Sequence, residues 1–315
     1  MACLIGAWVA DTLVYAPLAR WAQTRAQTVA IDDGHTTLTF AQLYAQVQHQ
    51  ADQLRRSHAP ETVFVDDQLS TVAQMVSFLA IITSGRCAAV SDPDWPSAVR
   101  QSVQNSFSTS ASTPPEPDPT SPFYIGFTSG STGIPKGFRR DHRSWTESLR
   151  VCIDTFGHDA ASAVLAPGRF SHSLFLFGMV LGLWSGAGVV VQERFSASRM
   201  MDTLKQGRTP CLVAVPSQLL LMLDLAARRH MSPMEDVRLV RLPDADKLSR
   251  QPGLTAGDLR RAFVALNPGF PLGSVGLRTS NGGWLREIHL CYGKKFMPVP
   301  CEARAFGPKN DVPLQ

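Results

Sequence analysis

A glycine-rich segment directly after an apolar strand is the feature that most constrains the fold of this chain. The strand is expected over Phe123–Phe127, and Phe127–Gly137 reads FTSGSTGIPKG. From Thr128 to Gly137 there are three glycines, three further hydroxyl side chains and one lysine. Glycines let a backbone turn its N–H groups toward an anion, hydroxyls donate hydrogen bonds to phosphate oxygens, and Lys136 adds a positive charge. The segment therefore predicts a loop that holds the phosphates of ATP.

Two other functional loops do not fit these residues. The lysine of a Walker loop follows a glycine, whereas Lys136 follows Pro135. The nucleophile elbow of hydrolases has serine at the centre of G-x-S-x-G, where Gly126–Gly130 has Thr128. A bland glycine- and serine-rich linker would not need the ordered TSGSTG-x-PKG arrangement directly behind an apolar strand. We therefore favour the phosphate-binding interpretation.

Strands and helices alternate before and after this loop. Val63–Val65, Thr71–Ser84 and Ala88–Ser91 predict strand, helix and strand, which favours an α/β domain with a parallel sheet. Residues 108–122 hold five prolines without apolar periodicity and are expected to form a flexible loop or a linker. The other expected elements are a helix around Leu18–Ala26, a hairpin over Val29–Phe40, helices over Ala41–Arg56 (capped by Thr39), Asp141–Phe156 and Ser173–Trp184, strands over Val189–Gln192 and Cys211–Val215, and a helix from a Ser217 cap to Arg229.

The balance of charge changes along the chain. Residues 1–120 carry 6 Lys/Arg against 11 Asp/Glu, a net of −5, and residues 121–315 carry 24 against 15, a net of +9. An excess of positive charge that begins near the glycine-rich loop suits a polyphosphate ligand, and a solvated basic face gives the same counts. The hydrophobic content of 44% and the length of 315 residues are those of a globular protein of about two domains.

Cysteine spacing and apolar stretches bear on metal sites and location. No pair of the six cysteines has the short spacing of a zinc or redox motif, so no structural metal is expected. The stretch between Arg169 and Glu193 is uncharged, but Ser185–Gly188 divides it into a helix and a short strand, which favours a soluble core over a membrane span. We expect a reduced, cytoplasmic protein in which four cysteines are buried small apolar residues: Cys3, Cys87, Cys152 and Cys211.

At the glycine-rich loop the chain resembles the adenylate-forming superfamily, which includes acyl-CoA synthetases, peptide-synthetase adenylation domains and luciferases. The resemblance covers about residues 15–240. Four neighbouring segments agree with the family in order: Leu38–Leu43 with its early LTYxEL element, Gly85–Pro93 with GAxxVPxDP, the segment around His172 (FSHSLFLFG) with the one beside the acyl pocket, and Pro216 with a VPT junction.

The resemblance implies a mechanism and a set of site residues. A carboxylate attacks the α-phosphorus of Mg·ATP to give an acyl-adenylate and pyrophosphate, and a thiol such as coenzyme A then takes the acyl group. Such transfers depend on positioning and charge neutralisation. His172 would border the carboxylate substrate as the catalytic candidate, or be a satisfied core histidine. The residues implied to hold the β- and γ-phosphates are Thr128, Ser129, Gly130, Ser131, Thr132, Gly133 and Lys136.

Several later elements of the family have no counterpart in this sequence. There is no YGxTE-like element for adenine and metal, no TGD-like element for the ribose, and no small C-terminal domain with the adenylation lysine. The fold expected from the resemblance is thus a truncated large N-terminal domain of an adenylate-forming enzyme, with parallel-sheet layers and helices, over residues 1–240. Adenylation by such a chain is expected to be impaired.

The tail, residues 241–315, resembles the C-terminal end of T-two-family ribonucleases. It is expected to hold a helix from about Thr255 to Leu266 and an antiparallel hairpin of Ser274–Thr279 and Leu285–Tyr292. Cys291 and Cys301 occupy the places of a cysteine pair of that family, which would bond only in an oxidising compartment. The family's catalytic histidine segments do not occur. A reading frame fused near Val240 would explain the two resemblances.

Three functions follow from these observations. The first is ATP- and Mg²⁺-dependent adenylation of a carboxylic acid, with coenzyme A as a possible acceptor and neither a membrane span nor a nucleic-acid partner. The second is a nucleotide-binding remnant without turnover. The third is a ribonuclease-related, RNA-binding protein that uses the tail, which carries 11 Lys/Arg against 6 Asp/Glu but lacks a catalytic pair.

Overall fold

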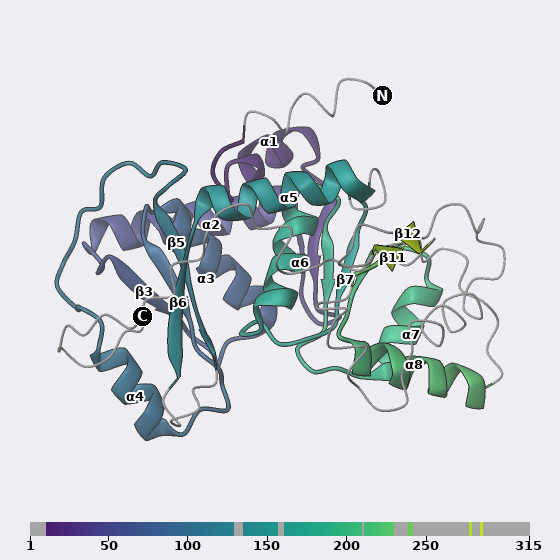
Figure 1. Cartoon of the computed structure of the whole chain (residues 1–315). Helices are drawn as coiled ribbons and strands as arrows, with labels where there is room; N and C mark the ends of the chain where they lie inside the picture. The colour runs from purple at the N-terminus through teal and green to yellow at the C-terminus, as the bar shows by residue number, and fades with distance from the viewer. Residues whose placement is uncertain are drawn as a thin grey trace.

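Two β-sheets, of six and four strands, with helices between and around them make up most of the described part of the chain, and β11 and β12 form a separate two-stranded sheet (Figure 1). The structure is a computed structural model that describes residues 11–128, 135–156, 161–209, 211–229, 239–241, 277–278 and 284–285. The α/β architecture predicted from the alternation of strands and helices is confirmed.

The six-stranded sheet is parallel except at one edge, where β1 and β2 form a hairpin. Its order is β10-β9-β7-β8-β1-β2. The strands are β1 (Val29–Asp32), β2 (Thr37–Thr39), β7 (Val164–Ala166), β8 (Val189–Val191), β9 (Cys211–Val213) and β10 (Leu239–Arg241). Because β10 runs parallel to β9 as far as residue 241, this sheet crosses the position near 240 at which the sequence suggested a junction.

The four-stranded sheet has the order β3-β4-β5-β6 and ends in the hairpin that carries the glycine-rich segment. β3 and β4 are parallel to β5, whereas β6 returns antiparallel to it. The strands are β3 (Thr62–Val65), β4 (Cys87–Val90), β5 (Pro122–Thr128) and β6 (Lys136–Asp141).

The helices fill the space between the sheets and cover their outer faces. The helix α3 (Thr71–Thr83) lies toward the four-stranded sheet and α6 (Ser173–Trp184) toward the six-stranded sheet (Figure 1). Both are apolar on nearly all sides, as buried helices must be. The remaining helices are α1 (Pro17–Thr24), α2 (Phe40–Arg56), α4 (Ser97–Asn105), α5 (His142–Phe156), α7 (Ala197–Lys205) and α8 (Pro216–Arg228).

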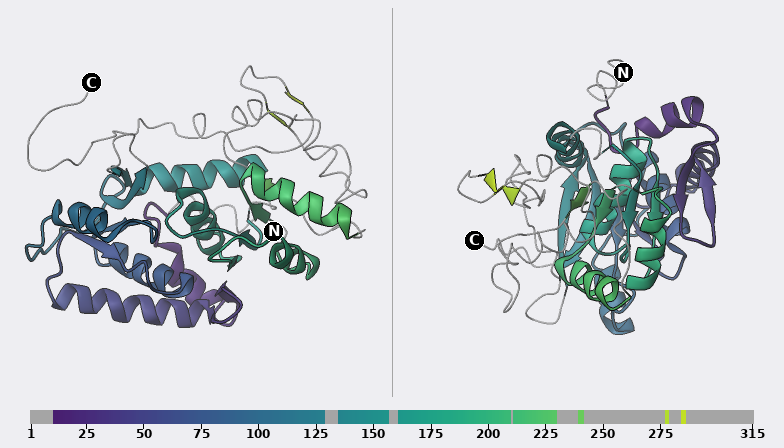
Figure 2. Two further views of the ribbon diagram at one scale, coloured as in Figure 1. Left: turned by 90° about the horizontal axis from the view of Figure 1, so that it is seen from below. Right: turned by 90° about the vertical axis from the view of Figure 1, so that its right-hand side faces the viewer.

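Single aromatic residues join the two halves of the molecule. Trp145 on α5 has its ring 5.3 Å from that of Phe123 on β5 and also 5.3 Å from that of Phe177 on α6. Phe78 on α3 contacts Phe123 at 6.2 Å and Phe170, just after β7, at 5.9 Å. Burial of these rings in one continuous core ties the two sheets together. Figure 2 shows the same layers from two further sides.

Local signals explain why several elements begin where the sequence predicts. Thr39 caps α2 in a capping box: its hydroxyl accepts from the Gln42 N–H at 3.3 Å, and the Gln42 side chain accepts from the Thr39 N–H at 2.9 Å. The helix α8 begins at Pro216, so Ser217 lies in its first turn and not at the predicted cap position. The Pro-rich residues 108–121 form a loop that connects α4 to β5 of the four-stranded sheet, and they are not a linker between domains.

Five elements were not predicted: α4, β6, β7, α7 and β10. α4 is a surface helix with Val103 as its one buried residue, and β6 is a charged strand, KGFRRD, at the sheet edge. β7 and β10 have only three residues each. α7 follows β8 and has nine residues, of which Met200, Met201 and Leu204 are buried. Short or polar segments offer few apolar positions from which a period can be recognised.

The cysteine and membrane predictions can be compared with the described residues. Cys87, Cys152 and Cys211 are buried as predicted, and burial raises the pKa of the Cys87 thiol to about 12. Within the part of the chain that the structure describes, no helix is long and apolar enough to cross a bilayer. Cys3, Cys291, Cys301 and the expected helix over 255–266 lie outside the described residues. The tail's β11 (Leu277–Arg278) and β12 (Trp284–Leu285) pair antiparallel, as the predicted hairpin requires.

Candidate functional site

A cavity of about 790 Å³ opens where the two sheets meet. Three turns form one side of it, and each follows a parallel strand of the six-stranded sheet: β7, β8 and β9. The β5–β6 hairpin forms the opposite side. Ligands of open α/β sheets bind in such crevices at the carboxyl ends of the strands. The lining residues are Asp92, Phe127, Thr128, Phe138, Gly168, Arg169, Ser171, His172, Ser173, Phe175, Arg194, Phe195 and Gln218.

The β5–β6 hairpin brings the two ends of the glycine-rich segment together. Thr128 and Lys136 are paired across the antiparallel strands, and the Thr128 hydroxyl donates to the Lys136 carbonyl at 3.4 Å. Both side chains are exposed. No ion pair engages Lys136 among the described residues, so its ammonium group is free to meet an anion.

The base of this hairpin is closely packed. A Cβ atom on Gly126 would lie 2.4 Å from the Tyr124 hydroxyl and 2.5 Å from Phe138 Cζ. Tyr124 is buried, and its ring meets that of Phe138 edge to face at 5.8 Å. Only glycine leaves room for both rings, which fix the strands that lead into the loop.

The turn between β7 and α6 brings His172 to the cavity. The His172 Nδ1 atom accepts a hydrogen bond from the Leu174 N–H at 3.3 Å and so caps α6. Removal of water from around the imidazole lowers its pKa, and the negative charge of Asp92 partly opposes this. The ring is therefore neutral at pH 7 and carries its proton on Nε2, which leaves one N–H donor for a ligand.

Gly168 in the same turn makes a very close approach to α6. A Cβ atom there would lie 2.2 Å from Cε2 of Phe175, which is 4% exposed. The Gln218 side chain holds this turn from the other side, because its amide donates to the Pro167 carbonyl at 2.9 Å. Its carbonyl oxygen accepts from the Val215 N–H at 3.1 Å. The turn is thus fixed between α6 and the start of α8.

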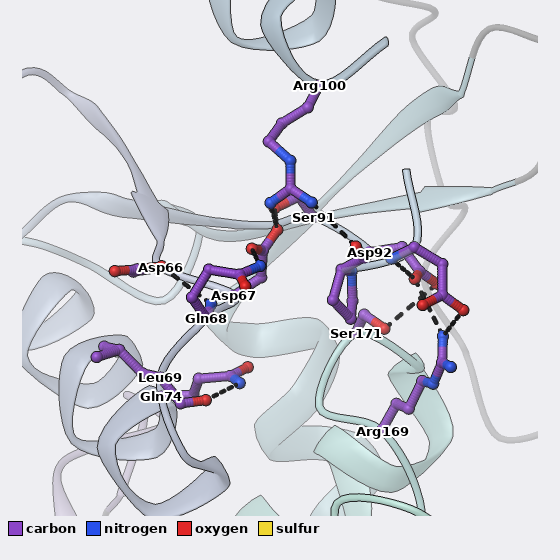
Figure 3. Close-up of polar contacts among 12 residues, drawn as sticks. Asp66, Asp67, Gln68, Leu69, Gln74, Ser91, Asp92, Arg100, Arg169 and Ser171 are labelled. Carbon is purple, nitrogen blue, oxygen red and sulfur yellow. Dashed lines mark hydrogen bonds and ion pairs between the residues drawn. The ribbon is translucent and has the colours of Figure 1, made fainter. Parts of the chain in front are cut away.

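A charged cluster joins this turn to the segment after β4 (Figure 3). Arg169 Nη1 lies 3.3 Å from Asp92 Oδ1 and also pairs with Asp94. The Ser171 hydroxyl faces Asp92 at 3.5 Å. Asp92 belongs to the four-stranded half and Arg169 to the six-stranded half, so the cluster spans the crevice between them.

A second ion pair lies next to the cluster and borders a smaller cavity of about 280 Å³. Asp67, after β3, pairs with Arg100 of α4 and accepts from the Ser91 hydroxyl at 2.8 Å (Figure 3). Burial raises the pKa of Asp67, but hydrogen bonds from Arg100, Gln68 and Ser91 outweigh it, and the net pKa is lowered. This pair anchors α4 and lines no part of the larger cavity.

The predicted site residues are partly placed by this geometry. Thr128 and His172 line the same cavity, and Lys136 is paired with Thr128 on the hairpin. Ser129, Gly130, Ser131, Thr132 and Gly133 lie outside the described residues. Six charged or polar residues of the lining were not predicted as site residues, because they come from several separate segments: Asp92, Arg169, Ser171, Ser173, Arg194 and Gln218. The SDP end of the family-like segment Gly85–Pro93 was the one available signal for Asp92.

A family model described as AMP-binding enzyme matches residues 97–289 of this chain. The match includes the hairpin, the three turns and part of the tail. The ribonuclease-like interpretation of residues 241–315, and the division of the chain near 240, stay predictions.

Curated relatives are CoA ligases by name. The uncharacterized acyl–CoA ligase YhfT of Bacillus subtilis (strain 168) is 39% identical over 126 residues, which are 40% of this chain and 26% of that protein. The putative long chain fatty acid-CoA ligase VraA of Staphylococcus aureus (strain MRSA252) is 24% identical over 201 residues, 58% of this chain and 43% of that protein. 4-coumarate–CoA ligase 1 of Oryza sativa subsp. japonica is 30% identical over 190 residues, 56% of this chain and 31% of that protein. The chain thus spans less than half the length of these relatives.

Solved structures show the same fold. VinN superposes with a TM-score of 0.66 at 16% identity, over 82% of this chain and 72% of that one. The AMPPNP-bound form of the nonribosomal peptide synthetase FmoA3 superposes with a TM-score of 0.68 at 19% identity, over 83% of this chain and 31% of that one.

Proposed function

Because the chain belongs to the AMP-binding enzyme family, we propose that it adenylates a carboxylic acid with ATP, in the manner of an acyl-CoA ligase. The observation that carries the proposal is the cavity itself. It lies at the carboxyl ends of three parallel strands and faces the hairpin whose ends enclose the TSGSTG loop. Names of the relatives support the ligase class.

The proposed reaction forms a bond between a carboxylate oxygen and the α-phosphorus of ATP. The bond from that phosphorus to the bridging oxygen breaks, and pyrophosphate leaves with the electron pair. Negative charge on the phosphates must be neutralised while this happens. Lys136 supplies an exposed ammonium group on the hairpin, at the position paired with Thr128. With residues 129–133 of the loop, we assign these two to the β- and γ-phosphates.

His172 is proposed to orient the carboxylate substrate. Its pKa is lowered, so at pH 7 the neutral imidazole offers a hydrogen bond from Nε2 and does not compete with Lys136 as a charge. The ring lies in the same cavity as Thr128, across from the hairpin. Phe127, Phe138, Phe175 and Phe195 add apolar wall to the cavity, which suits an acid with an apolar body.

The residues of the site fit the phosphates of ATP better than a resident metal ion. In the described ranges, no group of three or more His, Cys, Asp or Glu side chains is arranged to hold a metal. We infer that Mg²⁺ enters as the complex with ATP, whose phosphates supply ligands. Coenzyme A as the acceptor is inferred from the names of the relatives alone.

Exchange of labelled pyrophosphate into ATP tests the proposal. The acids should include a long-chain fatty acid, 4-coumarate and L-aspartate, which are the ones that the names of similar proteins suggest. We expect acid-dependent exchange, reduced about 100- to 1,000-fold by Lys136→Ala. Lys205→Ala is the matched control, because Lys205 is exposed on α7 and lines neither cavity described above. ATP binding without exchange for any acid would support the nucleotide-binding remnant instead.

A further inference from the structure

The two halves of the crevice meet at one charged contact on the side of the cavity. Arg169 stands in the turn that carries Gly168 and His172, and its two carboxylate partners, Asp92 and Asp94, follow β4 of the other sheet. Arg169, Asp92 and His172 all line the cavity. Figure 3 shows Arg169 and Asp92 pointing toward each other across the crevice.

We propose that Arg169 is a positioning residue of this site: by bridging Asp92 and Asp94 it sets where the β7–α6 turn, and with it His172, lies relative to the β5–β6 hairpin. The test of this role by pyrophosphate exchange rests on the function proposed above, whereas the test by titration of His172 does not. Arg169 is not proposed to touch the reacting atoms.

The exposure of the three side chains indicates that this contact contributes little to the stability of the fold. The side chains of Arg169, Asp92 and Asp94 are 41%, 40% and 67% exposed. Ion pairs in such surroundings contribute little to folding, because water screens them in both states. A planar guanidinium that meets two carboxylates does restrict geometry, and a lysine ammonium restricts it less.

A distant pair provides the control. Arg20 and Asp11 are also an Asp–Arg pair, and their side chains are 29% and 11% exposed. Neither residue lines either of the two cavities described above. Breaking this pair should leave His172 unaffected. The Asp67–Arg100 pair is not suitable, because Arg100 also donates to the Pro93 carbonyl at 3.0 Å, between Asp92 and Asp94.

The charges that border the cavity with His172 are Asp92, Arg169 and Arg194, with Asp94 bound to Arg169. Asp92 favours the protonated imidazole. Because the Arg169 guanidinium pairs with Asp92, its positive charge should offset part of that effect. Removal of Arg169 should therefore raise the pKa of His172, and removal of the Asp92 charge should lower it. The pKa of His172 should therefore shift in opposite directions in the two variants if Arg169 and Asp92 lie near its ring as the bridge places them.

An NMR titration of the His172 ring in the full chain measures this directly, with the signal assigned from His172→Asn. We expect Arg169→Gln to raise the pKa of His172, Asp92→Asn to lower it, and Arg20→Gln to leave it unchanged. Shifts of the same sign in the first two variants, no shift in either, or an equal shift in Arg20→Gln would overturn the proposal.

Pyrophosphate exchange provides the second readout. We expect Arg169→Gln to lower kcat about 10- to 100-fold, as misplacement of a positioned group does, with partial recovery in Arg169→Lys. The melting temperature should change by no more than about 2–4 °C. A loss of activity that follows a larger loss of stability, without recovery in Arg169→Lys, would make the role structural and contradict the proposal. Absent exchange in the wild type would count against the proposed function, and the titration would still decide the positioning role.

Discussion

Two of the contacts that join the two sheets are built from opposite chemistry. In the core, the ring of Phe78 is fully buried between Phe123 of one half and Phe170 of the other. Beside the cavity, Arg169 meets Asp92 and Asp94 at the surface. Buried aromatic area stabilises a fold strongly, whereas exposed ion pairs contribute about 0–1 kcal/mol. The first contact therefore holds the body together, and the second arranges the site.

The largest effect on stability is expected at the aromatic contact. Phe78→Ala removes a ring that also contacts Tyr124 at 6.2 Å, and the buried cavity that it leaves should cost about 3–5 kcal/mol of unfolding free energy. Denaturant unfolding of the variant measures this. Phe78→Leu, which keeps most of the volume, should lose less. If Phe78→Ala lowers the unfolding free energy by no more than Arg169→Gln does, the two contacts do not differ in their contribution to stability, which would contradict the comparison.

Acid should destabilise the core, and the buried residue His142 explains why. His142 is 1% exposed, stacks on Phe123 at 4.9 Å and accepts the Val14 N–H at 3.1 Å. Burial lowers its pKa from 6.5 to about 4, against the opposing charges of Asp141 and Asp118. The unfolded chain therefore binds more protons between these two values, so stability falls as the pH drops through that window, by about 3 kcal/mol in total.

Denaturant unfolding at pH 7 and at pH 4.5 separates His142 from the carboxylates. His142→Gln keeps an acceptor for Val14 and removes the titrating group. Its unfolding free energy should depend less on pH than that of the wild type. Equal pH dependence in the two proteins would show that His142 is not the responsible group.

A smaller loss of stability is expected at Gly168, which is closely packed and lies in the wall of the cavity. Gly168→Ala places a Cβ atom against Phe175, and the strain of overpacking should cost about 1–3 kcal/mol. The β7–α6 turn must then move, so exchange activity should fall along with stability. Phe175→Leu in the same chain should recover part of both, as thermal unfolding and exchange would show. A fully active, fully stable Gly168→Ala variant would mean that the turn is not tightly fixed.

The two walls of the cavity differ in how far the sequence predicts them. The hairpin wall is local: Thr128 and Lys136 are eight residues apart, and the order of glycines, hydroxyls and lysine between them has a direct chemical meaning. The opposite wall is assembled by topology. Asp92 and Arg169 are 77 residues apart, and they meet only because β4 and β7 belong to sheets that face each other across one crevice.

Strand length and burial explain the rest of the difference. Long apolar elements such as α3 and α6 show their nature in the sequence, and so does the capping box at Thr39. The three-residue strand β7 does not, although its turn carries Gly168, Arg169 and His172. His172 was predicted from the resemblance of its segment, but its role as the cap of α6 depends on where the helix begins.

The central claim is that the hairpin and the β7–α6 turn serve one adenylation site. The most direct measurement is acid-dependent pyrophosphate exchange in the wild type, Lys136→Ala, His172→Ala and the double variant. Because residues that act on the same transition state are not additive, the double variant should lose much less than the product of the two single losses. Losses that multiply fully, or the absence of exchange in the wild type with every acid, would contradict a shared site.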